Sequence, residues 1–318
     1  MATSQARVRR PPARGARLRA GVAFWRSSPL YRRRALTAYA FMAPSLVILL
    51  VFIVWPMIRA LWVSFEDYNV FSGGRWVGLD NYTKLVSDPV FRNALGNTLV
   101  YAGVTTPVSV GLALGLALLL NQAIRGRGLF RAAIFLPVVT SLAVAAIAWR
   151  FLLDPDIGLF AYWLGRIGLT TKAWLRDPSW AMPAVMLVGI WKNVGFYMVM
   201  YLAGLQSIPR EFYEASAMDG ATRWQRFRYV TWPLLANTTM FVFIIAAIAA
   251  LQAFDQIYVM TRGGPFFQTE TLVMLIYRMG FQEFEMGYAS AIAWVLVLLI
   301  FSLSIFQVRY FNKRQVRY

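Results

Sequence analysis

The sequence predicts an all-α integral membrane protein with six transmembrane helices. Of its 318 residues, 59% are hydrophobic, whereas soluble domains are typically about 45–50% apolar. The apolar residues also gather in six stretches, and each is long enough to cross roughly 30 Å of hydrocarbon as a helix. We place these spans at residues 38–58, 98–120, 132–153, 181–206, 236–259 and 286–308.

The N-terminal segment, residues 1–37, differs from the rest of the chain in composition. It holds ten arginines and no acidic residue, together with Pro11-Pro12 and scattered glycine and alanine. Such a segment cannot bury a core, so we expect a disordered basic arm ahead of a six-helix domain over 38–318. The arm suits an anionic lipid surface. The first span is too long for the apolar part of a signal peptide, and we expect it to remain as an anchor.

The distribution of lysine and arginine predicts the orientation. With both termini in the cytoplasm, 21 of the 32 Lys and Arg residues lie inside, and ten lie on the outer side, eight within the outer loops 60–97, 154–180 and 260–285 and two, Arg59 and Arg150, at the span ends beside them. Lys192, within the fourth span, completes the total. This excess follows the positive-inside rule. The net charge of +18 therefore indicates topology, and nucleic-acid binding is the weaker interpretation.

The composition also excludes several kinds of chemistry. The chain has no cysteine and no histidine, which removes thiolate and imidazole metal ligands and the commonest general base. None of its four lysines follows a glycine, so no Gly-Lys-[Ser/Thr] phosphate-binding loop is present. We therefore expect no catalytic residue, no metal site and no ATP hydrolysis in this chain.

Two spans carry clustered polar residues, which are costly in hydrocarbon and indicate function. The fourth span contains Trp191, Lys192 and Asn193, with Tyr197 beyond them. Amide and aromatic groups of this kind can hold hydroxyls and stack on sugar rings. An equally weighted alternative is that Lys192 forms an ion pair with Asp255 of the fifth span and fixes the fold.

In the fifth span, Gln252, Asp255 and Gln256 are spaced i, i+3, i+4, with Tyr258 close by. On a continuous helix this spacing places the three polar residues on one face. We expect a solute-contacting cluster, with the same ion pair as its structural alternative.

A polar interruption, residues 211–233, separates the fourth and fifth spans. Pro209 suits a first helical turn, and Glu211 and Glu214 suit the positive end of a helix dipole. Asp219-Gly220 predicts a helix break, and a second short amphipathic helix is expected before Pro233. A helix–turn–helix at the membrane surface indicates a docking element, and a solvated connector is the alternative.

The motif Glu214-Ala215-Ser216-x-x-Asp219-Gly220-Ala221, followed by Phe227, Val230 and Trp232-Pro233, resembles the cytoplasmic EAA loop of permease subunits of binding-protein-dependent ABC importers. Ser216, Val230 and Trp232 depart from the commonest form, where Ala, Ile and Leu stand, and only Trp232 is much larger. The resemblance extends over residues 38–312.

This resemblance implies a type I importer permease in the bacterial inner membrane, with a coupling loop over 207–233. The implied partners are a second homologous permease, two ATP-binding cassette ATPases that bind ATP and Mg, and an extracytoplasmic solute-binding protein. The coupling residues it implies are Glu214, Ala215, Ser216, Asp219, Gly220, Ala221, Phe227 and Pro233.

The runs around Trp191-Lys192-Asn193, Leu251–Asp255 and the Gly263-Gly264-Pro265 turn resemble both the oligosaccharide and the glycerol-3-phosphate branches of that family. The resemblance implies sugar import. At the positions that touch the sugar in the family stand Gln252 and Ala253, and Ala253 offers no hydrogen bond. Lys192 and Arg262 are the basic residues able to meet a phosphate. The expected substrate-path residues are Trp191, Lys192, Asn193, Tyr197, Gln252, Asp255, Gln256 and Tyr258.

The principal rival is a secondary transporter driven by an ion gradient. Such a carrier predicts paired carboxylates within the membrane, but Asp255 is the only acidic residue deep in an expected span. A membrane-embedded enzyme is disfavoured by the absence of histidine, cysteine and clustered carboxylates.

Overall fold

The computed structural model describes residues 29–168 and 172–312, and the chain divides after Ala60 into two compact parts. The described residues of the first part form α2 (Pro29–Leu49), the π-helical turn η1 (Leu50–Val54) and most of α3 (Trp55–Val63). Together, Arg33–Val63 is apolar and long enough to cross a membrane. Since α2 begins at Pro29, the end of the expected basic arm is helical, and residues 1–28 lie outside the described residues.

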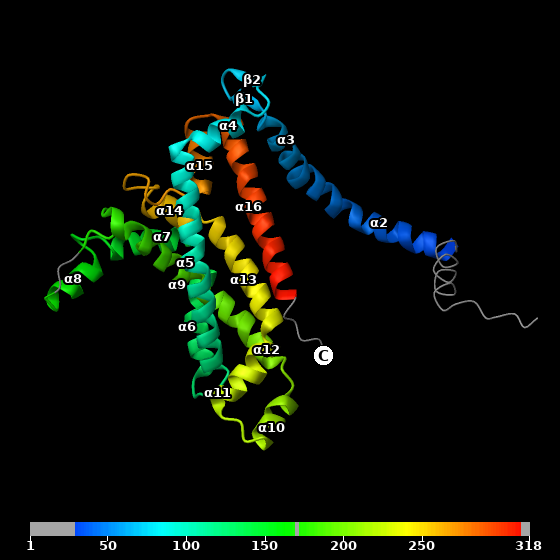
Figure 1. The fold of residues 1–318 in the computed structure, drawn as a ribbon, viewed down its shortest axis with the longest axis vertical. Coiled ribbons are helices and arrows are strands. Elements are labelled where there is room, and N and C mark those ends of the chain that lie inside the picture. Colours follow the sequence, from blue (N-terminus) through cyan, green and yellow to red (C-terminus); the bar gives the residue numbers. More distant parts are fainter. Residues whose placement is uncertain (1–28, 169–171, 313–318) are drawn as a thin grey trace, which may run out of the picture. The chain divides into compact units, whose positions relative to one another are not determined.

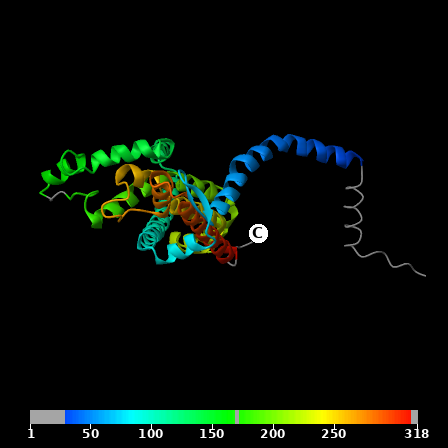
Figure 2. The same cartoon turned by 90° about the horizontal axis from the view of Figure 1, so that it is seen from above.

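The second part is a bundle in which the long helices α5, α9, α13 and α16 lie alongside one another (Figures 1 and 2). Its elements in chain order are β1 (Glu66–Asn69), β2 (Gly73–Trp76), α4 (Asp80–Ser87), α5 (Pro89–Leu120), α6 (Arg127–Val139), α7 (Leu142–Leu152), α8 (Leu159–Arg166), α9 (Pro178–Gln206), α10 (Arg210–Met218), α11 (Arg223–Arg226), η2 (Phe227–Thr231), α12 (Trp232–Leu234), α13 (Ala236–Leu251), α14 (Asp255–Met260), α15 (Leu272–Tyr277), η3 (Arg278–Gln282) and α16 (Met286–Asn312).

Five helical stretches of the described chain are apolar and long enough to be spans, and the bent pair α6 and α7 makes a sixth if it is counted as one. The predicted all-helical, six-span class is therefore confirmed. The prediction of one continuous third helix over 132–153 is wrong, because the chain turns by 100° between α6 and α7. Thr140 and Ser141 are extended there.

The segment 60–97, expected as an outer loop, contains strands that were not predicted from the sequence. β1 and β2 form an antiparallel hairpin that pairs Glu66 with Trp76, and Gly73 adopts a positive φ of 80° at its turn. The end of this segment, from Pro89 onward, is the start of α5. Asp88 caps that helix by accepting a hydrogen bond from the Val90 amide at 2.8 Å, which lengthens the second span beyond the expected 98–120.

Glycines of α9 allow close helix packing. A methyl group at Gly195 would collide with the carbonyl oxygen of Ile134 in α6, and one at Gly204 would collide with Thr238 of α13. In α5, by contrast, a methyl group at Gly103, Gly111 or Gly115 would meet no described atom within 4 Å.

A buried ion pair holds the segment 260–285, which was expected as the third outer loop. Glu270 is only 1% exposed, and Arg278 grips it with two hydrogen bonds, Nε to Oε1 at 2.8 Å and Nη2 to Oε2 at 3.1 Å. Arg278 also donates to Glu283 at 2.8 Å. A carboxylate this deeply buried is tolerated because its charge is paired and both oxygens are hydrogen-bonded. The pair therefore fixes the segment between α14 and α16.

Gly195→Ala tests the contact between α9 and α6. The added methyl group must displace a backbone carbonyl, and overpacking of this kind typically costs about 1–3 kcal/mol. We expect a lower midpoint of thermal unfolding in detergent, followed by tryptophan fluorescence. Gly103→Ala is the matched control, since its methyl group meets open space. Equal midpoints for the two variants would show that α9 does not pack against α6 in this way.

Candidate functional site

The fifth span is broken at residues 252–254. α13 ends at Leu251, Gln252 has left the helix (φ −99°, ψ 15°), Phe254 is irregular (φ −138°, ψ −59°), and α14 begins at Asp255. The expectation of one continuous helix over 236–259 that carries Gln252, Asp255 and Gln256 on a single face is therefore wrong. Non-helical backbone at membrane depth is tolerated where it is buried in protein or lines a cavity.

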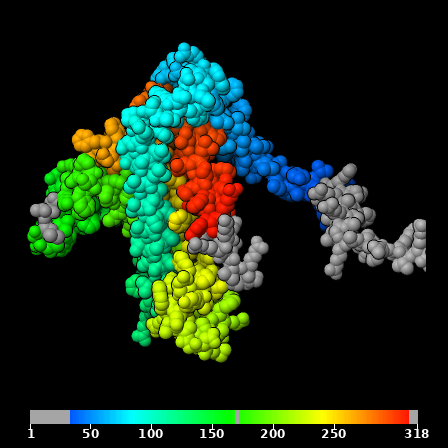
Figure 3. Space-filling model, viewed as in Figure 1, coloured from blue at the N-terminus to red at the C-terminus, as the bar shows by residue number. Residues whose placement is uncertain are grey.

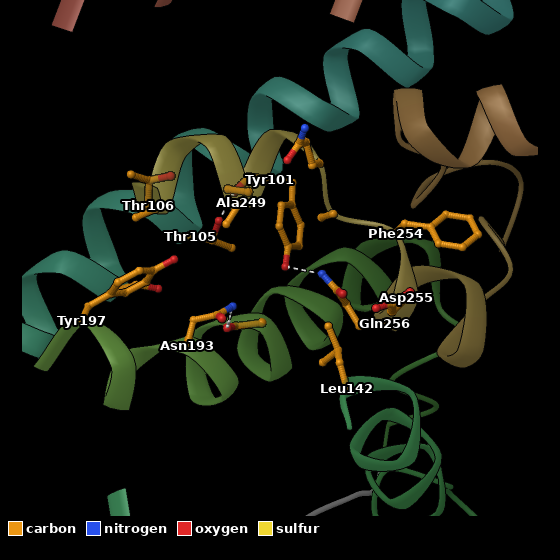
Figure 4. Close-up of a pocket in the computed structure, with 16 residues that line it drawn as sticks. Tyr101, Thr105, Thr106, Leu142, Asn193, Tyr197, Ala249, Phe254, Asp255 and Gln256 are labelled. Atoms are coloured by element: carbon orange, nitrogen blue, oxygen red, sulfur yellow. Dashed lines mark hydrogen bonds between the residues drawn. The ribbon is translucent and has the colours of Figure 1, made fainter. Parts of the chain in front are cut away.

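This break lines a cavity of about 230 Å³ within the second part of the chain (Figure 4). Its walls come from α5, α9, α13 and the start of α14. The structure brings five of the residues predicted from the sequence to this cavity: Asn193, Tyr197, Gln252, Asp255 and Gln256. Trp191, Lys192 and Tyr258 do not line it.

Hydrogen bonds fix two of the cavity's polar groups. The Gln256 amide donates to the Tyr101 hydroxyl of α5 at 2.8 Å, which is drawn as a dashed line in Figure 4. Gly189 of α9 leaves room for that hydroxyl, since a methyl group there would collide with it. The Asn193 amide donates to the Gly189 carbonyl at 3.0 Å. Amide, hydroxyl and carboxylate groups are thus gathered in one place.

Asp255 supplies the carboxylate of this cavity. Its side chain is exposed, and within 29–168 and 172–312 no lysine or arginine forms an ion pair with it. The carboxylate can therefore accept hydrogen bonds from a molecule in the cavity.

The sequence analysis named no residue of the second span for this site, but α5 forms a full wall of it. Tyr101, Thr105, Thr106 and Ser109 line the cavity from α5 and are buried. Tyr101, Thr105 and Ser109 repeat at i, i+4 and i+8, which places three hydroxyls on one helix face. This periodicity of hydroxyl residues in an apolar span was the signal available in the sequence.

Lys192 has a different role from either one that we considered. It is 8% exposed, and its Nζ donates to the carbonyl oxygens of Pro137, Val138 at 2.9 Å and Thr140 at 2.6 Å. An ammonium group has three protons, and all three point at the end of α6. The expected ion pair with Asp255 is therefore wrong, because the charge is used to satisfy carbonyls that the α6–α7 break leaves without helical partners.

Trp191 and Tyr258 lie beside the cavity rather than in its wall. The Trp191 ring packs edge-on against Trp149 of α7, with ring centroids 5.4 Å apart. Tyr258 stacks on Phe254, at 5.4 Å and an interplanar angle of 20°. Phe254 itself lines the cavity, so Tyr258 supports the wall from behind.

A second candidate site is the surface formed by α10, α11, η2 and α12, which we call the coupling surface. It lies at the end of the bundle opposite the β1–β2 hairpin (Figures 1 and 3). The predicted helix break is confirmed, since α10 ends at Met218 with Asp219 as its C-cap, and Gly220 adopts a positive φ of 74°. Thr222 and Gln225 then form a capping box that starts α11, which the sequence analysis did not identify.

The coupling surface exposes large apolar side chains. Met218 is 86% exposed, Tyr229 74% and Trp224 69%. The Tyr213 hydroxyl lies 3.2 Å from Thr231 Oγ1 and joins α10 to η2. A cluster of exposed apolar side chains surrounded by polar residues is typical of a protein interaction site. The expected coupling residues divide in burial: Glu214, Ala215, Asp219 and Gly220 are exposed, and Ser216, Ala221, Phe227 and Pro233 are half-buried.

Span-length apolar helices around a polar cavity, with a structured loop at one end, define a membrane transport subunit. The chain belongs to the family described as binding-protein-dependent transport system inner membrane component, which matches residues 108–317. It is thus an integral inner-membrane permease subunit of an ABC importer, a transport component rather than an enzyme. The alternative of a carrier driven by an ion gradient gains no support from this membership.

Several known proteins are similar to the chain over most of its length. It is 34% identical to the sn-glycerol-3-phosphate transport system permease protein UgpA of Agrobacterium fabrum, over 87% of this chain and 94% of that protein. It is 36% identical to the probable ABC transporter permease protein YurN of Bacillus subtilis, over 86% and 95% respectively.

Among solved structures, the chain resembles a subunit of a bacterial ABC transporter involved in the import of the acidic polysaccharide alginate. The TM-score is 0.80 at 26% identity, and the match covers 90% of this chain and 99% of that one. A second structure of the alginate transporter, in complex with an alginate pentasaccharide-bound periplasmic protein, matches with a TM-score of 0.79 at 27% identity. These matches confirm the predicted type I importer architecture.

Lys192→Met tests the assignment of Lys192 to the α6–α7 break. Methionine keeps the apolar stem but removes the three donors, and hydrogen bonds to a charged group are each worth roughly 1.5–3 kcal/mol. We expect a clearly lower midpoint of thermal unfolding. Lys84→Met is the control, because the Lys84 ion pair with Glu285 is exposed and such pairs contribute little. A Lys192→Met midpoint equal to that of the wild type would contradict the assignment.

Proposed function

We propose that this chain and a second homologous permease together form the translocation path for a sugar or a related hydroxylated solute. The observation that carries this is the polar cavity at the broken fifth span, where amides, hydroxyls and the Asp255 carboxylate converge. These groups accept and donate hydrogen bonds to hydroxyls, and they lie among apolar helices that exclude water. The names of the relatives, which refer to glycerol phosphate and alginate, support a hydroxylated solute.

The remaining partners in this proposal follow from the two ends of the bundle. Two cytoplasmic ATPases, which bind the ATP and Mg, engage the permeases through their coupling surfaces, and an external binding protein delivers the solute. The positive-inside excess of Lys and Arg supports a cytoplasmic position for both termini and for the loop 207–233. The periplasmic protein in the alginate transporter complex supports the external partner. The basic arm, 1–37, would then lie on the cytoplasmic lipid surface.

The proposed mechanism is alternating access. α9 leads directly into α10, and α12 leads into α13, so the coupling surface is joined at both ends to helices that line the cavity. Movement of the coupling surface when the ATPases close would therefore shift α9 and α13 against α5. That shift would open the cavity to one side of the membrane and then to the other.

Gly220→Pro tests the coupling surface. Gly220 sits at a φ of 74°, which proline cannot adopt because its ring fixes φ near −65°. We expect loss of solute uptake, with the variant still present in the membrane. Gly220→Asn is the matched control, since asparagine tolerates the left-handed conformation, and it should retain most of the uptake.

Glu214→Lys should also abolish uptake, because it reverses an exposed charge of the coupling surface. Normal transport in both Gly220→Pro and Glu214→Lys would refute the assignment.

Gln252→Ala and Asp255→Asn test the cavity. Gln252→Ala removes an amide from the wall, and Asp255→Asn replaces a charged acceptor by a neutral amide. We therefore expect slower uptake while the ATPases still co-purify with the variant. Uptake is measured with intact cells, and ATPase retention by affinity purification. Loss of the folded protein from the membrane, rather than loss of uptake alone, would assign these residues a structural role.

A further inference from the structure

One buried hydroxyl in the cavity wall has no partner in the described protein. Thr106 of α5 is 4% exposed and lines the cavity. Its Oγ1 makes no hydrogen bond with any described residue. Figure 4 shows Thr106 on the same side of the cavity as Tyr197, away from Phe254. A buried hydroxyl without a partner costs free energy, so this position needs an explanation.

Other threonines of the same helix show that the lack of a partner is not a property of threonine in α5. Thr98 Oγ1 donates to the Ala94 carbonyl at 2.8 Å and accepts from the Leu272 amide at 2.8 Å. Thr105 Oγ1 donates to the Tyr101 carbonyl at 2.7 Å. Both use the carbonyl four residues earlier, which is the usual partner of a helical threonine. Thr106 does not, so a buried hydroxyl of this cavity-lining residue is left without a partner.

The neighbours of Thr106 extend this hydroxyl surface. Ser109, less than one turn further along α5, is also 4% exposed and lines the cavity. The wall opposite, on α9, presents Asn193 and Tyr197. A molecule held between these helices would meet hydroxyl groups from α5 and an amide and a phenol from α9.

We infer that the α5 wall, through Thr106 and Ser109, contacts the solute directly and selects for hydroxyl groups on it. The inference rests on the proposed function of the cavity and adds to it a specificity-determining helix. The Thr106 hydroxyl donates to, or accepts from, a hydroxyl of the solute and gains in that complex the partner that it lacks in the free protein.

This role predicts opposite effects on stability and on binding. Valine has nearly the shape of threonine but lacks the hydroxyl, so Thr106→Val removes an unpartnered polar atom from the free protein. The midpoint of thermal unfolding should stay equal or rise. Binding of a hydroxylated solute should weaken, because the solute hydroxyl that meets Thr106 would then be buried without a partner.

The experiment uses the complete importer, with both permeases and the ATPases, in lipid nanodiscs. The external binding protein is left out so that its own affinity does not mask that of the cavity. Scintillation-proximity binding is measured with three radiolabelled probes: maltose, glucose and sn-glycerol-3-phosphate. With the probe that binds the wild-type complex, Thr106→Val should raise the dissociation constant about 3- to 10-fold.

Two variants serve as matched controls. Thr106→Ser keeps the hydroxyl and should bind within about twofold of the wild type. Thr98→Val makes the same change at a residue of α5 that does not line the cavity, and it should also stay within about twofold; both limits lie below the loss expected for one hydrogen bond.

The outcomes separate this inference from the proposed function. A dissociation constant for Thr106→Val equal to that of the wild type would overturn the inference alone, because the Thr106 hydroxyl would then make no contact with the solute. A wild-type complex that binds none of the three probes would contradict the proposed solute class, and the inference would fall with it.

Discussion

The structure depends on one constraint: backbone groups at membrane depth must find partners within the protein. Two of its spans are nevertheless interrupted, and each interruption is accommodated differently. Between α6 and α7 the freed carbonyls of Pro137, Val138 and Thr140 accept hydrogen bonds from Lys192. Between α13 and α14 the unwound backbone lines the polar cavity. The first break is closed by a charge from α9, and the second is left open to a solute.

α9 connects these features. Gly195 lets it approach α6, Gly189 leaves room for the Tyr101 hydroxyl of α5, and Gly204 allows contact with α13. The same helix carries Lys192 to the α6–α7 break and Asn193 and Tyr197 to the cavity. It then continues into the coupling surface at α10. A displacement of the coupling surface would thus act on a helix that packs tightly against α5, α6 and α13.

Sequence patterns predicted the features that depend on local residues. The apolar stretches gave the spans, and Asp219-Gly220 gave the helix break of the coupling surface. The interruptions within spans were not predictable in the same way, because the α6–α7 break requires a lysine more than 50 residues away in the chain. For the same reason Lys192 was misassigned: sequence alone shows a costly charge but not its partner. The α5 wall was missed because threonine and serine are too common in spans for hydropathy to distinguish those that face a cavity.

The central claim is that this chain works as one permease of a binding-protein-dependent importer. The most direct measurement is affinity purification of the full chain from its native membrane in mild detergent, with mass spectrometry of the co-purifying proteins. We predict that a second six-span permease and an ATPase that carries a phosphate-binding loop co-purify with the wild-type chain. In the Gly220→Pro variant only the ATPase should be lost or reduced. Recovery of this chain by itself, from a complex shown to be intact, would contradict the account.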